Sequence, residues 1–410
     1  MHPLIWGSAM PYRADFGARY ALAAARTIVG AGGQVLPDSA VIVNEGTIEW
    51  VGPRDGLPLL PVVDLPGGTL MPGFVDAHVH LALDAGSHPI GTMEERSGAE
   101  LAALMVRNAG TLLMSGVTTA RDLGAPASLA TEVKKLLATG KAPGPRLAVA
   151  GRPLTSPGGH CAVMGATCTS AADLSRAIQA MAAEGVDWIK IMVTGGFMTV
   201  GSDPNRPQFT ADLVAHAVTE AGRLGLPVAA HAHSPEGIEI AAAAGVRTVE
   251  HCTWFEQGAL RFVEASAALL AGNGAAVCPT LSPNSCREDG KVPWSARKAH
   301  LTAMRALGVA LITGTDAGIR NTPFDSYAAS LLPLLDLGMS PLDIIETATS
   351  VTAEAIGLGA TVGTIEPGKA ADLVLVAGNP LGDLTRLAAI VLVVARGRAY
   401  PLIEEGPHGV

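Results

Sequence analysis

Short apolar runs alternate with helical patterns along most of the chain. Between about residues 69 and 360, eight apolar runs are each followed by a segment whose apolar residues recur every three or four positions. The expected strands are 70–81, 116–124, 146–154, 187–196, 227–233, 247–252, 275–281 and 310–318. Several helical segments end at a glycine, which commonly terminates a helix. Eight strand–helix repeats predict the α/β class and a (β/α)8 TIM barrel, whose active site lies at the carboxyl ends of the strands.

The segments that flank these repeats follow a different pattern. Residues 21–52 and 361–402 contain short runs with a two-residue alternation, split by Gly-rich turns. Because each flank is too short to bury a core alone, we expect the two to pair in one small β-sandwich built from both termini. The predicted limits are 16–70 and 361–403 for the two parts of the sandwich and 71–360 for the barrel between them.

Composition and charge narrow the classes of partner. Of the 410 residues, 49% are hydrophobic and 16% are charged, the net charge is −9, and basic residues do not cluster among aromatic ones. Nucleic acid is therefore not an expected partner. Charged, Gly and Pro residues interrupt the apolar runs before they reach membrane-spanning length, so no membrane partner is expected. The five cysteines form no CxxC pair, and the N-terminus lacks the pattern of a signal peptide, which predicts a cytoplasmic protein.

Polar residues stand near the carboxyl ends of several predicted strands. His78 and His80 are two positions apart in GFVDAHVHL, so both imidazoles point to the same face of a strand. Such a pair alone is about as often structural as metal-binding. Further predicted strand ends carry Lys190, His231, His251 and Asp316. Four imidazoles and a carboxylate suffice for two divalent cations.

Lys190 conflicts with such a site at first sight, because a buried ammonium beside cations is unfavourable. The conflict disappears if CO2 carbamylates the amine, which turns the cation into a bridging carboxylate. The apolar setting WIKIMV favours this interpretation over an exposed, salt-bridged lysine.

The motifs around these residues resemble those of the amidohydrolase superfamily, in the branch of imidazolonepropionase-like enzymes and Xaa-Pro or Xaa-Arg/Lys dipeptidases. The motifs are LMPGFVDAHVHL, SGVTTARDLG, DWIKIMVTGG, GVRTVEHC, TGTDAG and VGTIEPGKAADLVLVAGNPL, and the resemblance extends over about residues 20–400. It implies two divalent metal ions, one held by His78, His80 and Asp316 and the other by His231 and His251. Zinc is the expected metal, although Mn, Co and Fe suit the same ligand types.

The resemblance also implies a mechanism. A carbamylated Lys190 and a hydroxide bridge the metal ions, the hydroxide attacks the amide carbonyl, and Asp316 carries a proton to the leaving nitrogen. His160, in the loop SPGGHC, is the second catalytic candidate and is expected to contact the scissile carbonyl, with an exposed loop position as the alternative. Glu250, beside His251, is expected to point away from the site as a structural partner.

Three residues are candidates for substrate binding. His233 shares a strand face with His231 and competes with it as a ligand, and the family pattern favours His231. Arg121 either forms an ion pair with Asp122 at a strand end or meets a substrate carboxylate. Arg206 is another candidate partner for that carboxylate.

The expected function is hydrolysis of an amide C–N bond by a binuclear, peptidase-like amidohydrolase. The expected partner is a small-molecule or peptide substrate, namely an N-acyl amino acid or a peptide. The sequence leaves open whether the chain forms a homo-oligomer. Two enzymatic alternatives are ring opening of a cyclic amide, as in imidazolonepropionase, and follower-peptide removal in a bottromycin-type biosynthetic pathway. The non-catalytic alternative is an inactive barrel used as a binding subunit, and the six expected metal-site residues argue against it.

Overall fold

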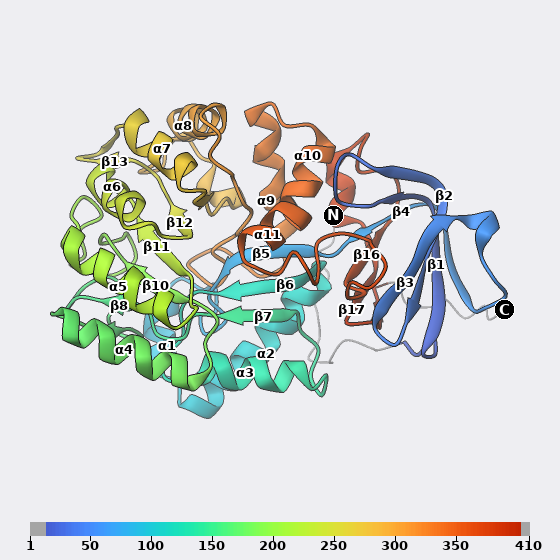
Figure 1. Ribbon diagram of the computed structural model, residues 1–410, viewed down its shortest axis with the longest axis horizontal. Helices are drawn as coiled ribbons and strands as arrows, with labels where there is room; N and C mark the ends of the chain where they lie inside the picture. Colours follow the sequence, from blue (N-terminus) through green and yellow to red (C-terminus); the bar gives the residue numbers. More distant parts are fainter. Residues whose placement is uncertain (1–13, 403–410) are drawn as a thin grey trace.

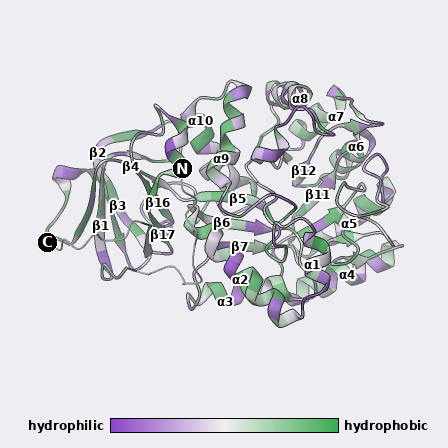
Figure 2. Cartoon of the chain, turned by 180° about the vertical axis from the view of Figure 1, so that it is seen from behind, coloured by the Kyte–Doolittle hydropathy of each residue, from purple (hydrophilic) through white to green (hydrophobic). Residues whose placement is uncertain are grey.

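The computed structural model describes residues 14–402 as an α/β structure with four sheets, which confirms the predicted class. Figure 1 shows parallel strands surrounded by helices at one end of the molecule and a larger, separate sheet at the other. In Figure 2, hydrophobic residues follow strands in both parts, and hydrophilic residues are common on the surrounding helices and loops. The start of the N-terminal stretch, at residues 1–13, and the predicted limit at residue 403 lie outside the described range.

The two flanks form one seven-stranded sheet. In spatial order its strands are β18 (Arg398–Pro401), β17 (Ile390–Ala395), β16 (Leu373–Val376), β4 (Val62–Pro72), β1 (Arg19–Ile28), β2 (Val35–Asn44) and β3 (Thr47–Pro53). The flanks meet where β16 pairs antiparallel with β4. One apolar core, which includes Leu22, Val41, Leu70 and Leu373, draws on strands of both flanks. The two flanks therefore pair with each other, as expected. They form a single continuous sheet, whereas the predicted β-sandwich would have two packed sheets.

The parallel strands form two further sheets. One contains β5 (Phe74–Val79), β6 (Val117–Asp122) and β7 (Arg146–Val149). The other contains, in spatial order, β15 (Ala276–Cys278), β12 (Thr248–His251), β11 (Val228–Ala232), β10 (Ile189–Met192), β8 (Leu154–Thr155) and β9 (Ala166–Thr167). The short strands β13 (Phe255–Glu256) and β14 (Ala259–Leu260) pair separately. A backbone hydrogen bond of 2.8 Å from Asp187 to Val149 joins the two larger parallel sheets.

The segment 310–318 is not the regular strand that we predicted. Within residues 14–402 it forms only isolated bridges, at Leu311 and Ala317. The reason is local, because Asp316 has a φ of +61° and the Thr313 amide donates to the side chain of Thr352. The segment nevertheless lies between β15 and β5, since Val277 donates to the Ala310 carbonyl and Ala77 donates to the Thr313 carbonyl. The predicted third strand is also divided, into β7 and β8, with Gly151 at a φ of +65° between them.

Helices follow most of the parallel strands. They are α1 (Pro89–Glu94), α2 (Gly98–Met114), α3 (Leu129–Ala138), α4 (Ala171–Glu184), α5 (Ala211–Arg223), α6 (Pro235–Ala244), α7 (Glu264–Gly272), α8 (Trp294–Ala306), α9 (Tyr327–Leu331), α10 (Pro341–Glu346) and α11 (Thr352–Ala355). Capping boxes at Ser97 and Ser170 begin α2 and α4. Left-handed Gly185 and Gly245 end α4 and α6, which confirms the predicted glycine stops. Among residues 14–402, no helix has the length and apolar character needed to cross a membrane.

Candidate metal centre

The predicted metal ligands meet in one cavity of about 340 Å³. The cavity lies at the carboxyl ends of the parallel strands, where His80 follows β5, His233 follows β11 and His251 ends β12. Eight predicted site residues line it: His78, His80, His160, Lys190, His231, His233, His251 and Asp316. Arg121 and Arg206 do not line it.

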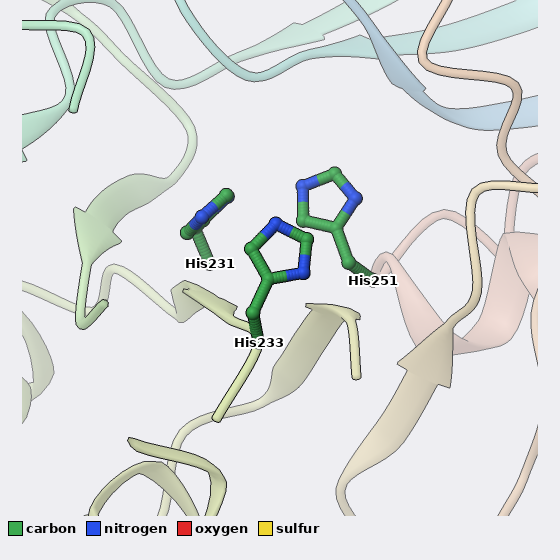
Figure 3. A group of neighbouring side chains, drawn as sticks. All are labelled: His231, His233 and His251. Carbon is green, nitrogen blue, oxygen red and sulfur yellow. The ribbon is translucent and has the colours of Figure 1, made fainter. Parts of the chain in front are cut away.

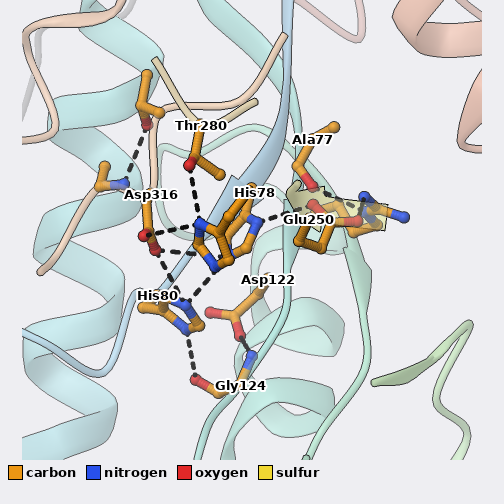
Figure 4. Close-up of polar contacts among 12 residues, drawn as sticks. Ala77, His78, His80, Asp122, Gly124, Glu250, Thr280 and Asp316 are labelled. Carbon is orange, nitrogen blue, oxygen red and sulfur yellow. Dashed lines mark hydrogen bonds and ion pairs between the residues drawn. The ribbon is translucent and has the colours of Figure 1, made fainter. Parts of the chain in front are cut away.

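One group of candidate ligands consists of His78, His80 and Asp316, whose donor atoms lie within 4.8 Å of one another. Asp316 Oδ1 lies 3.4 Å from His78 Nε2 and 3.2 Å from His80 Nε2, and the two Nε2 atoms are 3.3 Å apart. Figure 4 shows the three side chains pointing toward one another. Burial alone would raise the pKa of Asp316, but the two imidazoles and the Lys190 amine hold it at about 2, so this carboxyl is ionised at neutral pH.

The buried carboxylate of Glu250 orients His78 through Nδ1, the ring nitrogen that does not face His80 and Asp316. His78 Nδ1 lies 2.8 Å from Glu250 Oε2, and Glu250 Oε1 accepts a hydrogen bond of 2.8 Å from Arg121 Nη2. Burial opposes ionisation of Glu250, yet Arg121 and His78 outweigh it and hold the pKa of this carboxyl well below its usual range. Because an ionised carboxylate only accepts hydrogen bonds, Nδ1 of His78 carries the proton and Nε2 keeps a free lone pair.

The second group consists of His231, His233 and His251, whose donor atoms also lie within 4.8 Å of one another. Figure 3 shows the three imidazoles converging, with His231 and His233 from one strand end and His251 from the next. Their other ring nitrogens have neutral partners. His231 Nε2 lies 3.0 Å from the Gly195 carbonyl, and the Nδ1 atoms of His233 and His251 lie 3.0 and 2.9 Å from the hydroxyls of Thr253 and Thr280.

Asp316 lies between the two groups, because its Oδ2 is 4.0 Å from His251 Nδ1. Asp316 and His251 both have left-handed backbones, with φ values of +61° and +66°. Such conformations are costly for residues other than glycine and cluster at functional sites. At His251 the strand alternation also ends, which lets both Glu250 and His251 face the interior.

Lys190, on β10, is 1% exposed, and its Nζ atom has no hydrogen-bond partner among residues 14–402. Burial lowers the pKa of Lys190 to about 8. An unpartnered buried amine is costly in an unmodified protein. The unpartnered amine is compatible with carboxylation, which would turn this side chain into an oxygen ligand.

His160 is 6% exposed, so the alternative of an exposed loop histidine is wrong. Its ring centroid is 4.6 Å from that of His231, and its Nδ1 has no hydrogen-bond partner in the described part of the chain. A Cβ atom on Gly196 would lie 2.5 Å from His160 Nε2, so only glycine fits there. Burial lowers the pKa of His160 to about 4, which keeps the imidazole neutral at neutral pH.

The sequence pattern of the amidohydrolase family matches residues 69–400 of this chain. The chain belongs to the amidohydrolase family. It is a hydrolase that acts on C–N bonds, as predicted.

Individual relatives agree with the resemblance seen in the motifs. The chain is 26% identical to ochratoxinase from Aspergillus niger over 397 residues, which cover 86% of this chain and 80% of that protein. It is 27% identical to imidazolonepropionase from Salinispora arenicola over 380 residues, 82% of this chain and 85% of that one. The crystal structure of a Xaa-Pro dipeptidase with methionine bound in its active site matches 93% of this chain and all of its own, with a TM-score of 0.82 and 26% identity.

The donor set fits the divalent metals that amidohydrolases use. Imidazole and carboxylate ligands together suit zinc and other first-row divalent ions. The two groups of buried ligands, each with three converging donor atoms, and the orphaned amine beside them are all features of the described residues.

Two predicted substrate contacts of this amidohydrolase, Arg121 and Arg206, do not line the cavity. Arg121 is fully buried, and its guanidinium donates hydrogen bonds to the Ala77 carbonyl, Thr248 and Glu250. It also lies over the Trp188 ring. Arg121 therefore supports the site indirectly, by holding Glu250. Arg206 is 85% exposed in its side chain and pairs with Asp203 outside the cavity. The loop sequence around Arg206 does not indicate whether that side chain turns toward the cavity.

The predicted ion pair of Arg121 with Asp122 is also absent. Asp122 accepts hydrogen bonds from the backbone of Leu81 and Gly124 instead. Glu250 is the structural partner that we expected, but it does not point away, because it contacts His78 directly. The signal that could have revealed this role is a lone carboxylate in the short strand TVEH, directly before the predicted ligand His251.

Proposed function

We propose that this amidohydrolase is a binuclear metal enzyme that hydrolyses the amide bond of a small peptide or an N-acyl amino acid. The observation that carries the proposal is the buried Lys190 amine, which has no hydrogen-bond partner in the part of the chain that the structure describes. It lies in a cavity lined by four imidazoles of the predicted set and Asp316. A carboxylated Lys190 would join two metal ions, with zinc the expected metal. Burial favours this step, because a lysine whose pKa is lowered to about 8 is partly neutral at neutral pH and can react with CO2.

The ligand assignment follows the two groups. His78, His80 and Asp316 would hold one ion, and His231 and His251 would hold the other. His233 lies close enough to serve as a further donor of the second group or as a substrate contact. When bound, the ions would lower the pKa of water toward neutrality and polarise the substrate carbonyl.

The remaining steps belong to side chains of the chain itself. Asp316 is ionised and accepts the proton of the attacking water, which it then delivers to the leaving nitrogen. His160 is neutral and faces the cavity, where its ring can donate a hydrogen bond to the scissile carbonyl. Glu250 keeps His78 in the tautomer whose Nε2 is free.

The size of the cavity favours a small substrate. Its volume of about 340 Å³ lies near the lower end of the usual range for ligand sites, roughly 300–1,000 Å³. Ring opening of a cyclic amide is the second candidate, supported by the similarity to imidazolonepropionase. Follower-peptide removal stays a prediction that no observation favours, and the complete ligand set argues against an inactive binding subunit.

We also propose the finer architecture that would support this chemistry. The links from β7 to β10, from β15 to residue 310 and from residue 313 to β5 would close an eight-stranded (β/α)8 barrel over residues 71–360. Residues 16–70 and 361–403 would form the second domain. The same proposal places the protein in the cytoplasm, without nucleic acid or membrane partners. It leaves open whether the chain forms a homo-oligomer.

Metal analysis and substrate profiling test the function together. We expect about two metal equivalents per chain, a carbamate on Lys190 by mass spectrometry, and hydrolysis within a library of N-acyl amino acids, dipeptides and lactams. Lys190→Ala should abolish turnover, and added short-chain carboxylic acids should restore part of it by replacing the missing carboxylate. Lys134→Ala, which removes a surface lysine paired with Asp187, is the control and should keep full activity. A metal-loaded protein that hydrolyses no member of the library would refute the proposal.

A further inference from the structure

One wall of the cavity contains a buried arginine that the proposed mechanism does not use. Arg297, on α8, lines the same cavity as the metal ligands and is only 5% exposed. Its Nη2 donates to the Pro279 carbonyl, and its Nε has no hydrogen-bond partner within residues 14–402. In that part of the chain, no carboxylate lies within ion-pair distance of its guanidinium.

The carboxylates on neighbouring elements are already engaged. Asp336 accepts a hydrogen bond of 2.8 Å from Trp294 Nε1, one turn before Arg297 on the same helix. Asp289, in the preceding loop, pairs with Arg287 at 2.6 Å. The ionisable groups that act on Arg297 are the thiols of Cys252, Cys278 and Cys286, which are weak acids.

A buried guanidinium without a counter-ion is unfavourable, because it has lost its hydration without gaining an opposite charge. Burial accordingly lowers the pKa of Arg297, although an arginine stays protonated. An anion that enters the cavity would supply the missing charge and hydrogen bonds. Planar guanidinium groups match carboxylates in particular, through two parallel hydrogen bonds.

We propose that Arg297 binds a free carboxylate of the substrate, so that the enzyme acts on amides with a carboxylate near the scissile bond. This inference rests on the proposed function and assigns to Arg297 the role that sequence patterns suggested for Arg121 and Arg206. The same cavity suits the rest of such a substrate, because Met192, Phe197 and Met198 also line it and provide apolar surface.

Binding of a matched probe pair tests the proposal without relying on turnover. The probes are N-acetyl-L-leucine, which ends in a carboxylate, and N-acetyl-L-leucinamide, which ends in a neutral carboxamide of similar shape. Their affinities are measured by titration calorimetry on metal-loaded protein. We expect the wild-type protein to bind the acid about 10- to 100-fold more tightly, as for a hydrogen bond between charged groups. Arg297→Met should abolish this preference, and Arg297→Lys should retain part of it.

Arg305→Met is the matched control, because Arg305 lies two turns later on α8 and also donates to a backbone carbonyl, that of Leu337. It should leave the preference unchanged. A wild-type protein with equal affinity for both probes would overturn the proposal, and this result needs no variant to fold. A preference that Arg297→Met keeps, and that chelation removes, would also overturn it by assigning the carboxylate to the metal ions.

The outcome is separable from that of the proposed function. A preference that depends on Arg297, in a protein that hydrolyses no amide, supports the carboxylate site and refutes the hydrolysis. Hydrolysis of amides without any preference for the acid refutes the site alone.

Discussion

The two candidate metal groups are held in place by different kinds of partner. His78, in the first group, is oriented by the Glu250 carboxylate, which is itself paired with the buried Arg121 guanidinium. The second group depends on neutral partners, the hydroxyls of Thr253 and Thr280 and one backbone carbonyl. Loss of a charge from a buried pair leaves its partner uncompensated, whereas loss of a hydroxyl removes one ordinary hydrogen bond. The first group should therefore be rigid and sensitive to substitution, and the second more tolerant.

The largest effect is expected where the two groups meet. Asp316→Asn removes the carboxylate that lies within 4.0 Å of imidazoles from both groups. Turnover should fall by about 10²- to 10⁴-fold, because a proton carrier is lost. Metal content should fall less, since the histidines remain. Near-wild-type turnover with normal metal content would exclude Asp316 as the proton carrier.

The comparison predicts a large stability effect at Glu250. Glu250→Gln leaves Arg121 buried without an opposite charge, which should lower the free energy of unfolding by about 3–5 kcal/mol. Metal affinity should fall by about 10- to 100-fold, because His78 loses its orienting carboxylate. Urea unfolding and metal titration measure the two effects. Glu184→Gln, which breaks a partly exposed pair with Arg152, is the control and should cost under about 1 kcal/mol.

After metal is removed by chelation, the buried histidines of the second group should make the free energy of unfolding depend on pH. Burial lowers the pKa of His233 to about 3, against about 6.5 in an unfolded chain. Between these values the unfolded chain binds a proton that the folded chain does not, so the stability from this group is complete above pH 6.5 and is lost as the pH falls. His233→Gln should reduce the slope by about 1.4 kcal/mol per pH unit. An unchanged slope between pH 6.5 and 4.5 would show that His233 is not buried in its neutral form.

The smallest effect is expected at a hydroxyl partner of the second group. Thr280→Val keeps the side-chain shape but removes the hydroxyl 2.9 Å from His251 Nδ1. Stability should fall by about 1 kcal/mol. Thr280→Ser keeps the hydroxyl and should retain metal affinity better than the valine variant. A loss at Thr280→Val as large as that at Glu250→Gln would contradict the difference between the groups.

Sequence patterns were sufficient to predict which candidate ligands come together, because each one stands in or just after a short apolar run. His78, His80, Lys190, His231, His251 and Asp316 all line the cavity, although whether they bind metal is still a prediction. The patterns failed where the direction of a side chain depends on residues that are distant in the sequence but close in space. The sequences around Arg121 and Arg297 do not distinguish the two residues. Tertiary packing buries Arg121 outside the cavity and places Arg297 in the cavity wall.

The irregular strand 310–318 was missed for a related reason. Its apolar run is typical of a strand, but the left-handed Asp316 and the hydrogen bond that the Thr313 amide donates to the Thr352 side chain interrupt the ladder. The single sheet made from both flanks was predictable in part, since alternation indicates strands. Which strands become neighbours depends on long-range contacts that a local pattern does not contain.

The pairing of β4 with β16 also has a consequence for synthesis of the protein on the ribosome. β16 follows β4 by about 300 residues, so one edge of β4 has no partner while the intervening segment is made. At roughly 5–20 residues per second, that interval lasts about 15–60 s. An unpaired, apolar strand edge is a template for association with other chains. The nascent polypeptide is therefore most vulnerable to aggregation late in translation, when most of the enzyme has emerged but its last strands have not.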